Sequence, residues 1–423
     1  MMLVGVSLKG TPAAAVEESL DELEQLATTA GGEVVGRLHQ RLEAPNASTY
    51  IGSGKAAELA AQARGGQVDT VVFDDELTPA QTRNLERLLE CKILDRTALI
   101  LDIFSQRART REGRLQVELA RLRHLLPRLT RYWTHLSRQK GGIGMRGGEG
   151  ETQLEADRRK VQERIDRLGR ELEEVRRQRE TQRQGRRRHL WPLASIVGYT
   201  NAGKSTLFNA LTGAEVLEED KLFATLDPTT RRLRLPTNQN VLLSDTVGFI
   251  RKLPHQLVDA FKATLEEVVM ADLLLHVVDI THPQAEEQVA AVNLVLEEIG
   301  VPARPTLMVF NKVDRLADEL AARLWLGRHP QAVLVSARTG EGFPALMAEL
   351  GSQLRPVREL VELVIPHTAA AALSRLHEVG QIVEQEFDGE AGHFTVWIPP
   401  FCRAEFSRFM AGPTGEGRPE ICD

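Results

Sequence analysis

The sequence predicts an α/β protein of several domains, and three observations support this fold class. The chain has 423 residues, enough for two to four domains of ordinary size. In two long stretches, short apolar runs alternate with helical patterns, as is typical of parallel α/β sheets. Between these stretches, apolar residues recur at spacings of four and three, which predicts a coiled-coil hairpin.

Composition excludes several classes of protein. The chain is 42% hydrophobic and 26% charged, as expected for a globular protein. No run of 18 uncharged apolar residues occurs, and residues 1–9 lack the pattern of a signal peptide, so we expect no membrane span. Three widely spaced cysteines (Cys91, Cys402 and Cys422) fit neither a disulfide framework nor a zinc site, which indicates a reducing, cytoplasmic compartment.

The charge is unevenly distributed along the chain. The formal net charge of the whole chain is −6. Residues 107–190 contain 24 Lys/Arg and 12 Asp/Glu, a net charge of +12, so the rest of the chain carries −18. A basic block within an acidic protein predicts a local binding site for a polyanion.

We expect residues 1–104 to form a parallel α/β domain, with strands near 3–8, 33–38, 70–73 and 92–94 and helices near 14–27, 55–63, 79–89 and 97–104. Two short motifs in this domain have open interpretations. Gly52-Ser53-Gly54-Lys55 is either a helix-entry turn or a contact with a ligand or RNA, and it lacks a hydroxyl after the lysine. Asp74-Asp75-Glu76 follows a strand and is either an acidic loop in solvent or a metal site.

We expect residues 105–190 to form an antiparallel coiled-coil hairpin. One apolar seam runs from Leu115 to Trp133 and a second from Val161 to Val175. Pro127 interrupts the first seam and predicts a kink or a break in that helix. The connecting loop, residues 141–150, contains six glycines and is either a flexible linker or a tip that becomes ordered on a partner.

Cations and aromatic residues beside this glycine loop favour an RNA-binding tip. Cationic side chains contact phosphates, and aromatic rings stack on unpaired bases. Tyr132, Trp133 and His135 supply the rings. The candidate RNA-binding residues are Arg131, Arg138, Lys140 and Arg146.

We expect residues 191–355 to form a phosphate-loop domain. The apolar run 193–197 leads into Gly198-Tyr199-Thr200-Asn201-Ala202-Gly203-Lys204-Ser205-Thr206, whose glycines let backbone N–H groups approach phosphate oxygens. A helix that opens at Lys204 adds a partial positive charge at its N-terminus. We expect Lys204 to reach the β- and γ-phosphates and the Ser205 hydroxyl to hold Mg²⁺.

Three further motifs follow in the order that a guanine nucleotide site requires. In the loop 222–230 a threonine, Thr225 or else Thr229, can close over Mg²⁺ and the γ-phosphate. Asp245 can hold Mg²⁺ through water, and Gly248 can donate its N–H to the γ-phosphate. The candidate metal ligands are therefore Ser205, Thr225 and Asp245, and the candidate catalytic residues are Lys204, Thr225 and Gly248.

The sequence Asn311-Lys312-Val313-Asp314 predicts the choice of base. The Asp314 carboxylate can accept hydrogen bonds from both N–H groups on the edge of guanine, whereas adenine offers no such pair of donors. The stem of Lys312 would lie over the ring, and the backbone N–H groups of Ser336 and Ala337 can reach the guanine O6. The four motifs together predict binding of GTP and GDP.

The residues next to these motifs bear on hydrolysis. Phe249 stands where many GTPases have a water-positioning glutamine, so we expect slow intrinsic hydrolysis that a partner stimulates. Asn201 either braces the loop or helps to hold a monovalent cation, K⁺, against the phosphates. Residues 356–423 read as strand, helix, strand and strand, near 360–365, 369–379, 382–387 and 394–398, which predicts a small α+β module.

At this point the chain resembles the HflX family of translation-associated GTPases over nearly its whole length. The resemblance is carried by residues 50–55, by 147–151 in the glycine loop, by 223–229, and by the hydrophobic Phe249. It implies a GTPase that binds the 50S ribosomal subunit through 23S rRNA and splits 70S ribosomes. Independently of the resemblance, we expect a cytoplasmic monomer. It also implies that Arg138, Lys140, Arg146 and the glycine tip contact rRNA.

Three functions stay open on the sequence. The first is a GTPase that dissociates or rescues ribosomes and that the ribosome stimulates. The second is a GTPase that acts in large-subunit assembly. The third is a regulatory switch whose GTP-bound state recruits a protein partner, and the basic, aromatic, glycine-rich tip favours the first two over it.

Overall fold

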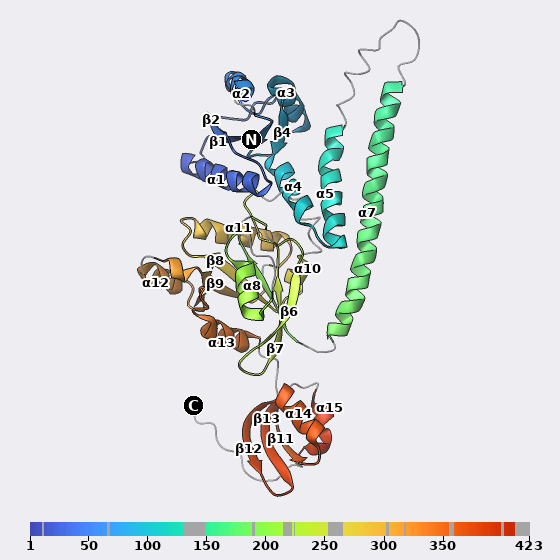
Figure 1. Cartoon of the computed structure of the whole chain (residues 1–423), viewed down its shortest axis with the longest axis vertical. Helices are drawn as coiled ribbons and strands as arrows, with labels where there is room; N and C mark the ends of the chain where they lie inside the picture. The colour runs from blue at the N-terminus through green and yellow to red at the C-terminus, as the bar shows by residue number, and fades with distance from the viewer. Residues whose placement is uncertain are drawn as a thin grey trace.

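The computed structural model describes residues 1–10, 12–65, 68–129, 149–187, 191–214, 222–223, 225–252, 265–301, 304–316, 319–354, 359–398 and 402–410. The N-terminal domain lies at one end with the helical hairpin beside it, the phosphate-loop domain lies in the middle, and a small sheet forms the other end (Figure 1). Among the described residues, no helix is long and apolar enough to cross a membrane.

The N-terminal domain is a four-stranded parallel sheet in the order β2-β1-β3-β4. Its elements are β1 (Met2–Leu8), α1 (Ala13–Thr29), β2 (Gly36–Leu42), α2 (Ser53–Gly65), β3 (Thr70–Phe73), α3 (Pro79–Leu89), β4 (Lys92–Asp95) and α4 (Arg96–Arg107). Thr78 caps α3 through a reciprocal bond with Gln81 and precedes a first-turn proline. The Gly52–Lys55 motif lies at the start of α2, where the Lys55 ammonium donates to Glu58 at 2.8 Å.

The hairpin consists of α5 (Arg111–Leu129) and α7 (Glu149–Arg187), which pack side by side (Figure 1). Their shared seam contains the predicted apolar residues, among them Leu115, Leu119, Ile165, Leu168 and Leu172. The predicted break at Pro127 is wrong, because α5 continues through it to Leu129. The seam extends to Leu126 beside the proline, and Pro127 itself is exposed.

The candidate RNA-binding residues Arg131, Arg138, Lys140 and Arg146 lie outside the described residues, as do the three aromatic residues near them. Most of the predicted glycine loop does so too. Its last two residues, Glu149 and Gly150, belong to α7, so the helix begins earlier than the sequence suggested.

The phosphate-loop domain has a six-stranded sheet in the order β10-β9-β8-β5-β7-β6, in which β6 is antiparallel to β7. The parallel strands end at one edge, which therefore collects the predicted nucleotide motifs. The elements are β5 (Leu193–Gly198), α8 (Lys204–Thr212), β6 (Thr229–Arg234), β7 (Asn240–Asp245), α10 (Glu266–Val269), β8 (Leu273–Asp279), α11 (Ala285–Glu298), β9 (Thr306–Asn311), η1 (Val313–Arg315), α12 (Glu319–Arg328), β10 (Val333–Leu334) and α13 (Phe343–Gln353).

The C-terminal module is a three-stranded antiparallel sheet in the order β11-β13-β12, and it has the expected strand, helix, strand, strand order. It comprises β11 (Glu359–Pro366), α14 (Ala370–Val379), β12 (Gln381–Phe387), β13 (Ala391–Ile398), α15 (Arg403–Phe406) and η3 (Ser407–Phe409). The two short C-terminal helices were not expected from the sequence.

One hydrophobic core is shared between the N-terminal domain and the phosphate-loop domain. It contains Leu20 and Phe104 from the first domain together with Phe223 and Phe249 from the second. The Phe104 and Phe223 rings meet edge to face at 4.7 Å between centroids. The two segments expected to respond to the nucleotide are therefore packed directly against the N-terminal domain.

Candidate nucleotide-binding site

The phosphate loop has a backbone that only glycine fits at two positions. Gly198 and Gly203 have φ angles of 149° and 91°. A Cβ on Gly198 would lie 2.2 Å from the Val277 carbonyl oxygen, and one on Gly203 would lie 2.3 Å from the Asn311 amide nitrogen. α8 begins directly after this loop at Lys204, and the first-turn N–H groups of a helix, here including that of Thr206, have no intrahelical partners. The loop therefore presents the backbone donors that a phosphate group needs.

Lys204 and Thr200 contribute buried polar groups to the same loop. Lys204 is 6% exposed, and its ammonium donates to the Tyr199 carbonyl oxygen at 2.7 Å. Burial lowers the pKa of Lys204 to about 8, although the Asp245 carboxylate opposes this effect. Among the described residues, the buried Thr200 hydroxyl has no hydrogen-bond partner. Both groups are suited to an anionic ligand.

The three predicted metal ligands come together in the structure. The Ser205 hydroxyl lies 2.8 Å from the Thr225 hydroxyl and donates to the Asp245 carboxylate at 2.8 Å. The second carboxylate oxygen of Asp245 is buried and has no hydrogen-bond partner in the described part of the chain, and burial raises the pKa of this group. Two hydroxyls and a carboxylate form a donor set of the kind that Mg²⁺ prefers, and a hydrated cation would satisfy the orphaned oxygen.

The geometry favours Thr225 over Thr229 as the threonine of this set. Thr229 lies at the start of β6, where its backbone pairs with Asp245 in the sheet register. Because β6 was not expected, the sequence ranked Thr225 first but did not exclude Thr229. Thr225 is 9% exposed, and its hydroxyl reaches the Ser205 hydroxyl.

Gly248 and Phe249 lie against the phosphate loop. A Cβ on Gly248 would lie 2.8 Å from the Thr200 methyl group and 2.9 Å from the Lys204 ammonium, so no larger residue fits. The Phe249 N–H donates to the Gly198 carbonyl oxygen at 3.1 Å, and its carbonyl accepts from the Thr200 N–H at 2.7 Å. The Phe249 ring belongs to the shared core and is 2% exposed.

The base-selecting motif is locked to the phosphate loop by hydrogen bonds. The Asn311 amide donates to the Ala202 carbonyl oxygen at 2.8 Å and accepts from the Ala337 N–H at 2.9 Å. The Lys312 ammonium donates to the Asn201 carbonyl oxygen at 2.9 Å and pairs with Asp279 at 2.7 Å.

Asp314 is positioned by a neighbouring hydroxyl. One of its carboxylate oxygens accepts from the Ser336 hydroxyl at 2.7 Å, and Ser336 is fully buried. This bond fixes the direction of the carboxylate before any base binds, which preorganises the group that would read guanine.

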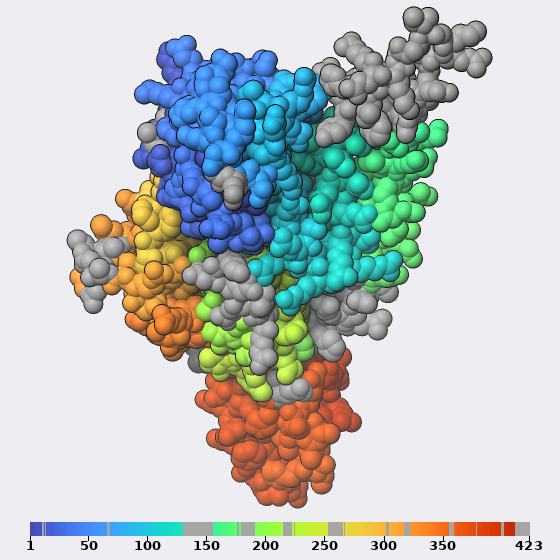
Figure 2. Space-filling view, turned by 45° about the horizontal axis from the view of Figure 1, so that its top comes forward, coloured from blue at the N-terminus to red at the C-terminus, as the bar shows by residue number. Residues whose placement is uncertain are grey.

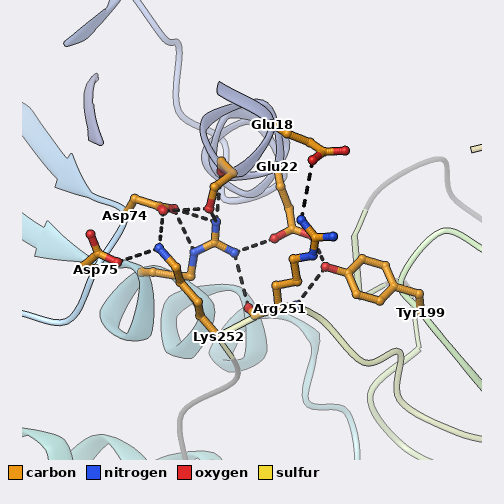
Figure 3. A network of polar contacts seen from close by, with 9 residues as sticks. Glu18, Glu22, Asp74, Asp75, Tyr199, Arg251 and Lys252 are labelled. Atoms are coloured by element: carbon orange, nitrogen blue, oxygen red, sulfur yellow. Dashed lines mark hydrogen bonds and ion pairs between the residues drawn. The ribbon is translucent and has the colours of Figure 1, made fainter. Parts of the chain in front are cut away.

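A polar network joins this site to α1 of the N-terminal domain (Figure 3). The Tyr199 hydroxyl donates to the Glu22 carboxylate, and it accepts from the Arg251 N–H at 2.8 Å. The Arg251 side chain in turn lies 3.5 Å from Glu18. Burial raises the pKa of Tyr199, so its hydroxyl stays protonated and remains a donor.

The centre of this network is Arg96, which is 2% exposed. Its guanidinium donates to Asp74 at 2.6 Å and to Glu22 at 2.6 Å, and to the Arg251 carbonyl oxygen at 3.4 Å. The Lys252 ammonium lies 2.5 Å from both Asp74 and Asp75 (Figure 3). Burial alone would raise the pKa of Asp74, but Arg96 and Lys252 hold it below its usual value.

Both interpretations of the Asp74-Asp75-Glu76 motif are therefore wrong for its first residue. The Asp74 side chain is 2% exposed, so it does not lie in a solvated acidic loop. Its partners are the cationic side chains of Arg96 and Lys252 and not a metal ion. Among the described residues, no group of three or more His, Cys, Asp or Glu side chains could hold a metal ion. Sequence reasoning missed Arg96, Arg251 and Lys252 because none of them belongs to a motif.

A second contact joins the site to the hairpin. The Asp227 carboxylate, from the loop that carries Thr225, accepts from the Arg109 N–H at 2.9 Å and from the Thr110 N–H at 3.0 Å. These donors precede α5, so Asp227 caps the entry to that helix from another domain. A Cβ on Gly113 would lie 2.5 Å from the same carboxylate, so close approach requires glycine there.

Comparisons with known proteins agree with this arrangement. Three protein-family models match in succession: GTP-binding GTPase N-terminal over residues 17–105, GTP-binding GTPase middle region over residues 107–186, and 50S ribosome-binding GTPase over residues 194–312. The chain is 49% identical to the GTPase HflX of Magnetococcus marinus over 403 residues, covering 95% of this chain and 92% of the relative. It is also 49% identical to the GTPase HflX of Escherichia coli over 382 residues, covering 90% and 89%.

A similar solved structure is that of SsGBP in complex with GDP. It is 27% identical to this chain, with a TM-score of 0.48, and the match covers 83% of this chain and 98% of that one.

Proposed function

The chain belongs to the HflX family of GTPases, and on this premise we propose that it binds the 50S ribosomal subunit and dissociates or rescues 70S ribosomes. Hydrolysis of GTP to GDP and phosphate is the activity of the family. The observation that carries the proposal is that segments of the nucleotide site directly contact the N-terminal domain and the hairpin. Tyr199 and Arg251 contact α1, and Asp227 contacts the start of α5.

These contacts give a physical route from the nucleotide to the ribosome-binding regions. A ligand shifts an equilibrium only if it binds two conformations with different affinity. The γ-phosphate would draw Thr225 and Gly248 toward itself, and these residues lie two positions from Asp227 and three from Arg251 along the chain. Their movement changes the contacts with α1 and α5, so the state of the nucleotide sets the position of the hairpin.

For hydrolysis we propose the following roles. Lys204 binds the β- and γ-phosphates, Thr225 and Gly248 orient the γ-phosphate, and Ser205, Thr225 and Asp245 hold Mg²⁺, with Asp245 acting through water. When bound, Mg²⁺ neutralises charge on the phosphate oxygens. Because Phe249 is buried in the shared core, it cannot position water. Intrinsic turnover is therefore slow, and the ribosome completes the site.

Asn201 is the proposed residue for K⁺. It lies at the fourth position of the phosphate loop with a φ of 61°, and its carbonyl accepts from Lys312. The test is the rate of hydrolysis in K⁺ and in Na⁺ at equal ionic strength. Equal rates, in wild type and in Asn201→Ala alike, would leave Asn201 with a bracing role only.

The decisive experiment adds the protein and a non-hydrolysable GTP analogue to intact 70S ribosomes and measures subunit release by sedimentation and light scattering. We expect release of subunits with the analogue and little release with GDP. Absence of splitting, together with binding to immature large subunits only, would favour a role in assembly. Binding to neither particle would favour the regulatory switch.

The proposed RNA contact of the hairpin has its own test. Replacing Arg138, Lys140 and Arg146 with alanine should weaken ribosome binding and flatten its salt dependence. The variant makes fewer phosphate contacts, so its binding releases fewer counterions from the RNA. Affinity for GTP should not change. The matched control replaces Arg159, Lys160 and Arg167, which are exposed on α7 and carry the same charge. Equal losses in both variants would indicate that only net charge matters.

A further inference from the structure

The sheet of the C-terminal module has one covered face and one open face. Along β11, Val361, Leu363 and Ile365 are buried, and they pack with Leu376 of α14 and Phe406 of α15. The residues between them point to the opposite face of the sheet. No helix of the described residues covers that second face (Figure 1). In the space-filling view the module projects from the end of the molecule (Figure 2).

The open face carries an aromatic and aliphatic centre. Trp397 on β13 stands beside Leu360 on β11 in the strand register, and the two are 39% and 51% exposed. In the next outward-facing row, Thr395 lies between Glu362 and Glu384, and both glutamates are exposed. Large apolar side chains clustered on an outer face commonly mark a binding surface.

The rim of the open face is acidic. Glu362, Glu384 and Glu386 are exposed, and no ion pair joins any of them to a cation among the described residues. The three arginines of the module have other partners: Arg375 pairs with Glu405 at 3.2 Å, Arg403 pairs with Glu359 at 2.5 Å, and Arg408 lies over the Phe409 ring. His393, which is next to Glu386 in the strand register, pairs with Asp388 at 2.9 Å. Residues 359–410 contain eight Asp/Glu, three Arg and no Lys, a formal net charge of −5.

We propose that the open face, defined by Leu360, Glu362, Glu384, Glu386 and Trp397, binds a lysine- and arginine-rich segment of a protein partner. The carboxylates attract such a segment and hold its cationic groups in place. The indole ring binds a cation over its face, and the aliphatic stems of lysine and arginine lie along Leu360.

The same charges exclude the other candidate occupants. The phosphates of RNA would be repelled, so this surface is opposite in kind to the basic hairpin at residues 107–190. A second copy would present the same acidic rim. Residues 411–423 carry three acidic residues and one arginine, so they do not match the face either.

The open face would give the molecule a second contact, in addition to the proposed function and with a different chemistry. RNA would be the partner of the hairpin, and a basic protein would be the partner of the module at the opposite end of the molecule (Figure 1). This contact does not depend on whether the factor splits ribosomes or helps to assemble them.

The test places the photo-crosslinking residue p-benzoylphenylalanine at position 397 of the full-length protein. Two targets are offered: 50S subunits with a non-hydrolysable GTP analogue, and a labelled oligolysine peptide alone. We expect crosslinks to a basic polypeptide of the subunit and to oligolysine. The same residue at position 324, which is a leucine 61% exposed on α12, serves as the control and should give neither crosslink.

Charge reversal completes the test. Glu384→Lys together with Glu386→Lys should reduce oligolysine crosslinking about tenfold at low salt, whereas Glu287→Lys on α11 should leave it unchanged. Intrinsic GTP hydrolysis should be equal in all variants, which verifies folding. Crosslinks to rRNA or to a second copy, or no crosslink to either target, would overturn the proposal. Failure to pellet with 50S while oligolysine still crosslinks would contradict the proposed function instead.

Discussion

Replacing Tyr199 with phenylalanine removes one hydroxyl and keeps the ring in place. That hydroxyl donates to the Glu22 carboxylate of α1 and accepts from the Arg251 N–H at 2.8 Å. Tyr199 is 5% exposed, so water cannot freely replace the lost group. The change therefore tests whether this hydroxyl holds the segment after Gly248 against the N-terminal domain.

The expected increase in local opening follows from the hydrogen-bonding groups that the substitution leaves without a partner. Glu22 keeps its ion pair with Arg96 at 2.6 Å, so it loses one bond of two. The Arg251 N–H loses its acceptor, and a donor left without a partner in a partly buried place costs about 1–3 kcal/mol. At 1.4 kcal/mol for each factor of ten, local opening around Arg251 should become about 5- to 150-fold more frequent.

Amide hydrogen exchange measured at Arg251 and Lys252 reports this opening directly. The control is Thr78→Ala, which removes the cap of α3 within the N-terminal domain and costs about 1 kcal/mol without touching the network. Exchange in α3 should rise in the control and exchange at Arg251 should not. If Tyr199→Phe left the Arg251 amide unchanged, or if the control accelerated it equally, the hydroxyl would not be what holds the segment.

Three further predictions concern other parts of the chain. Asp314→Asn should weaken GDP binding about 10²- to 10⁴-fold and strengthen binding of xanthosine diphosphate, as measured by fluorescence titration; equal loss for both nucleotides would indicate misfolding. Because burial lowers the pKa of Lys204 to about 8 in the free protein and bound phosphate raises it, GDP affinity should fall as pH rises through 8. The loss should be about tenfold between pH 7 and pH 9, and a flat profile would contradict it. Gly113→Ala should lower the free energy of unfolding by about 1–3 kcal/mol, because its Cβ meets Asp227, whereas Gly169→Ala on α7 meets nothing and should stabilise the helix in denaturant titrations.

The features that the sequence predicted well are those set by neighbouring residues. Thr78-Pro79 begins α3 as a cap and first-turn proline should, and the glycines at 198 and 203 have the positive φ angles that the phosphate loop needs. The convergence of Ser205 and Asp245 follows from strand order, because Asp245 ends β7 and Ser205 follows the parallel neighbour β5 at the same edge of the sheet.

The features that it did not predict depend on distant pairing. Asp74 and Lys252 are 178 residues apart, and no local pattern distinguishes a carboxylate that pairs in the interior from one in solvent. β6 pairs antiparallel with β7 although its residues are mostly polar and partly exposed, so its apolar alternation is weak. α5 continues past Pro127 while its neighbour Leu126 packs in the seam with the second helix, and helix propensity takes no account of such tertiary packing.

The core that Phe104, Phe223 and Phe249 build together makes the two halves of the molecule inseparable. A fragment that began at residue 191 would expose the apolar faces of Phe223 and Phe249 to water, and a fragment of the first 104 residues would expose Phe104. Neither half can therefore be transferred alone into another protein. Chimeras that exchange one half between members of the family must take both contributions to this shared core from the same relative. Otherwise they will aggregate and will not respond to the nucleotide.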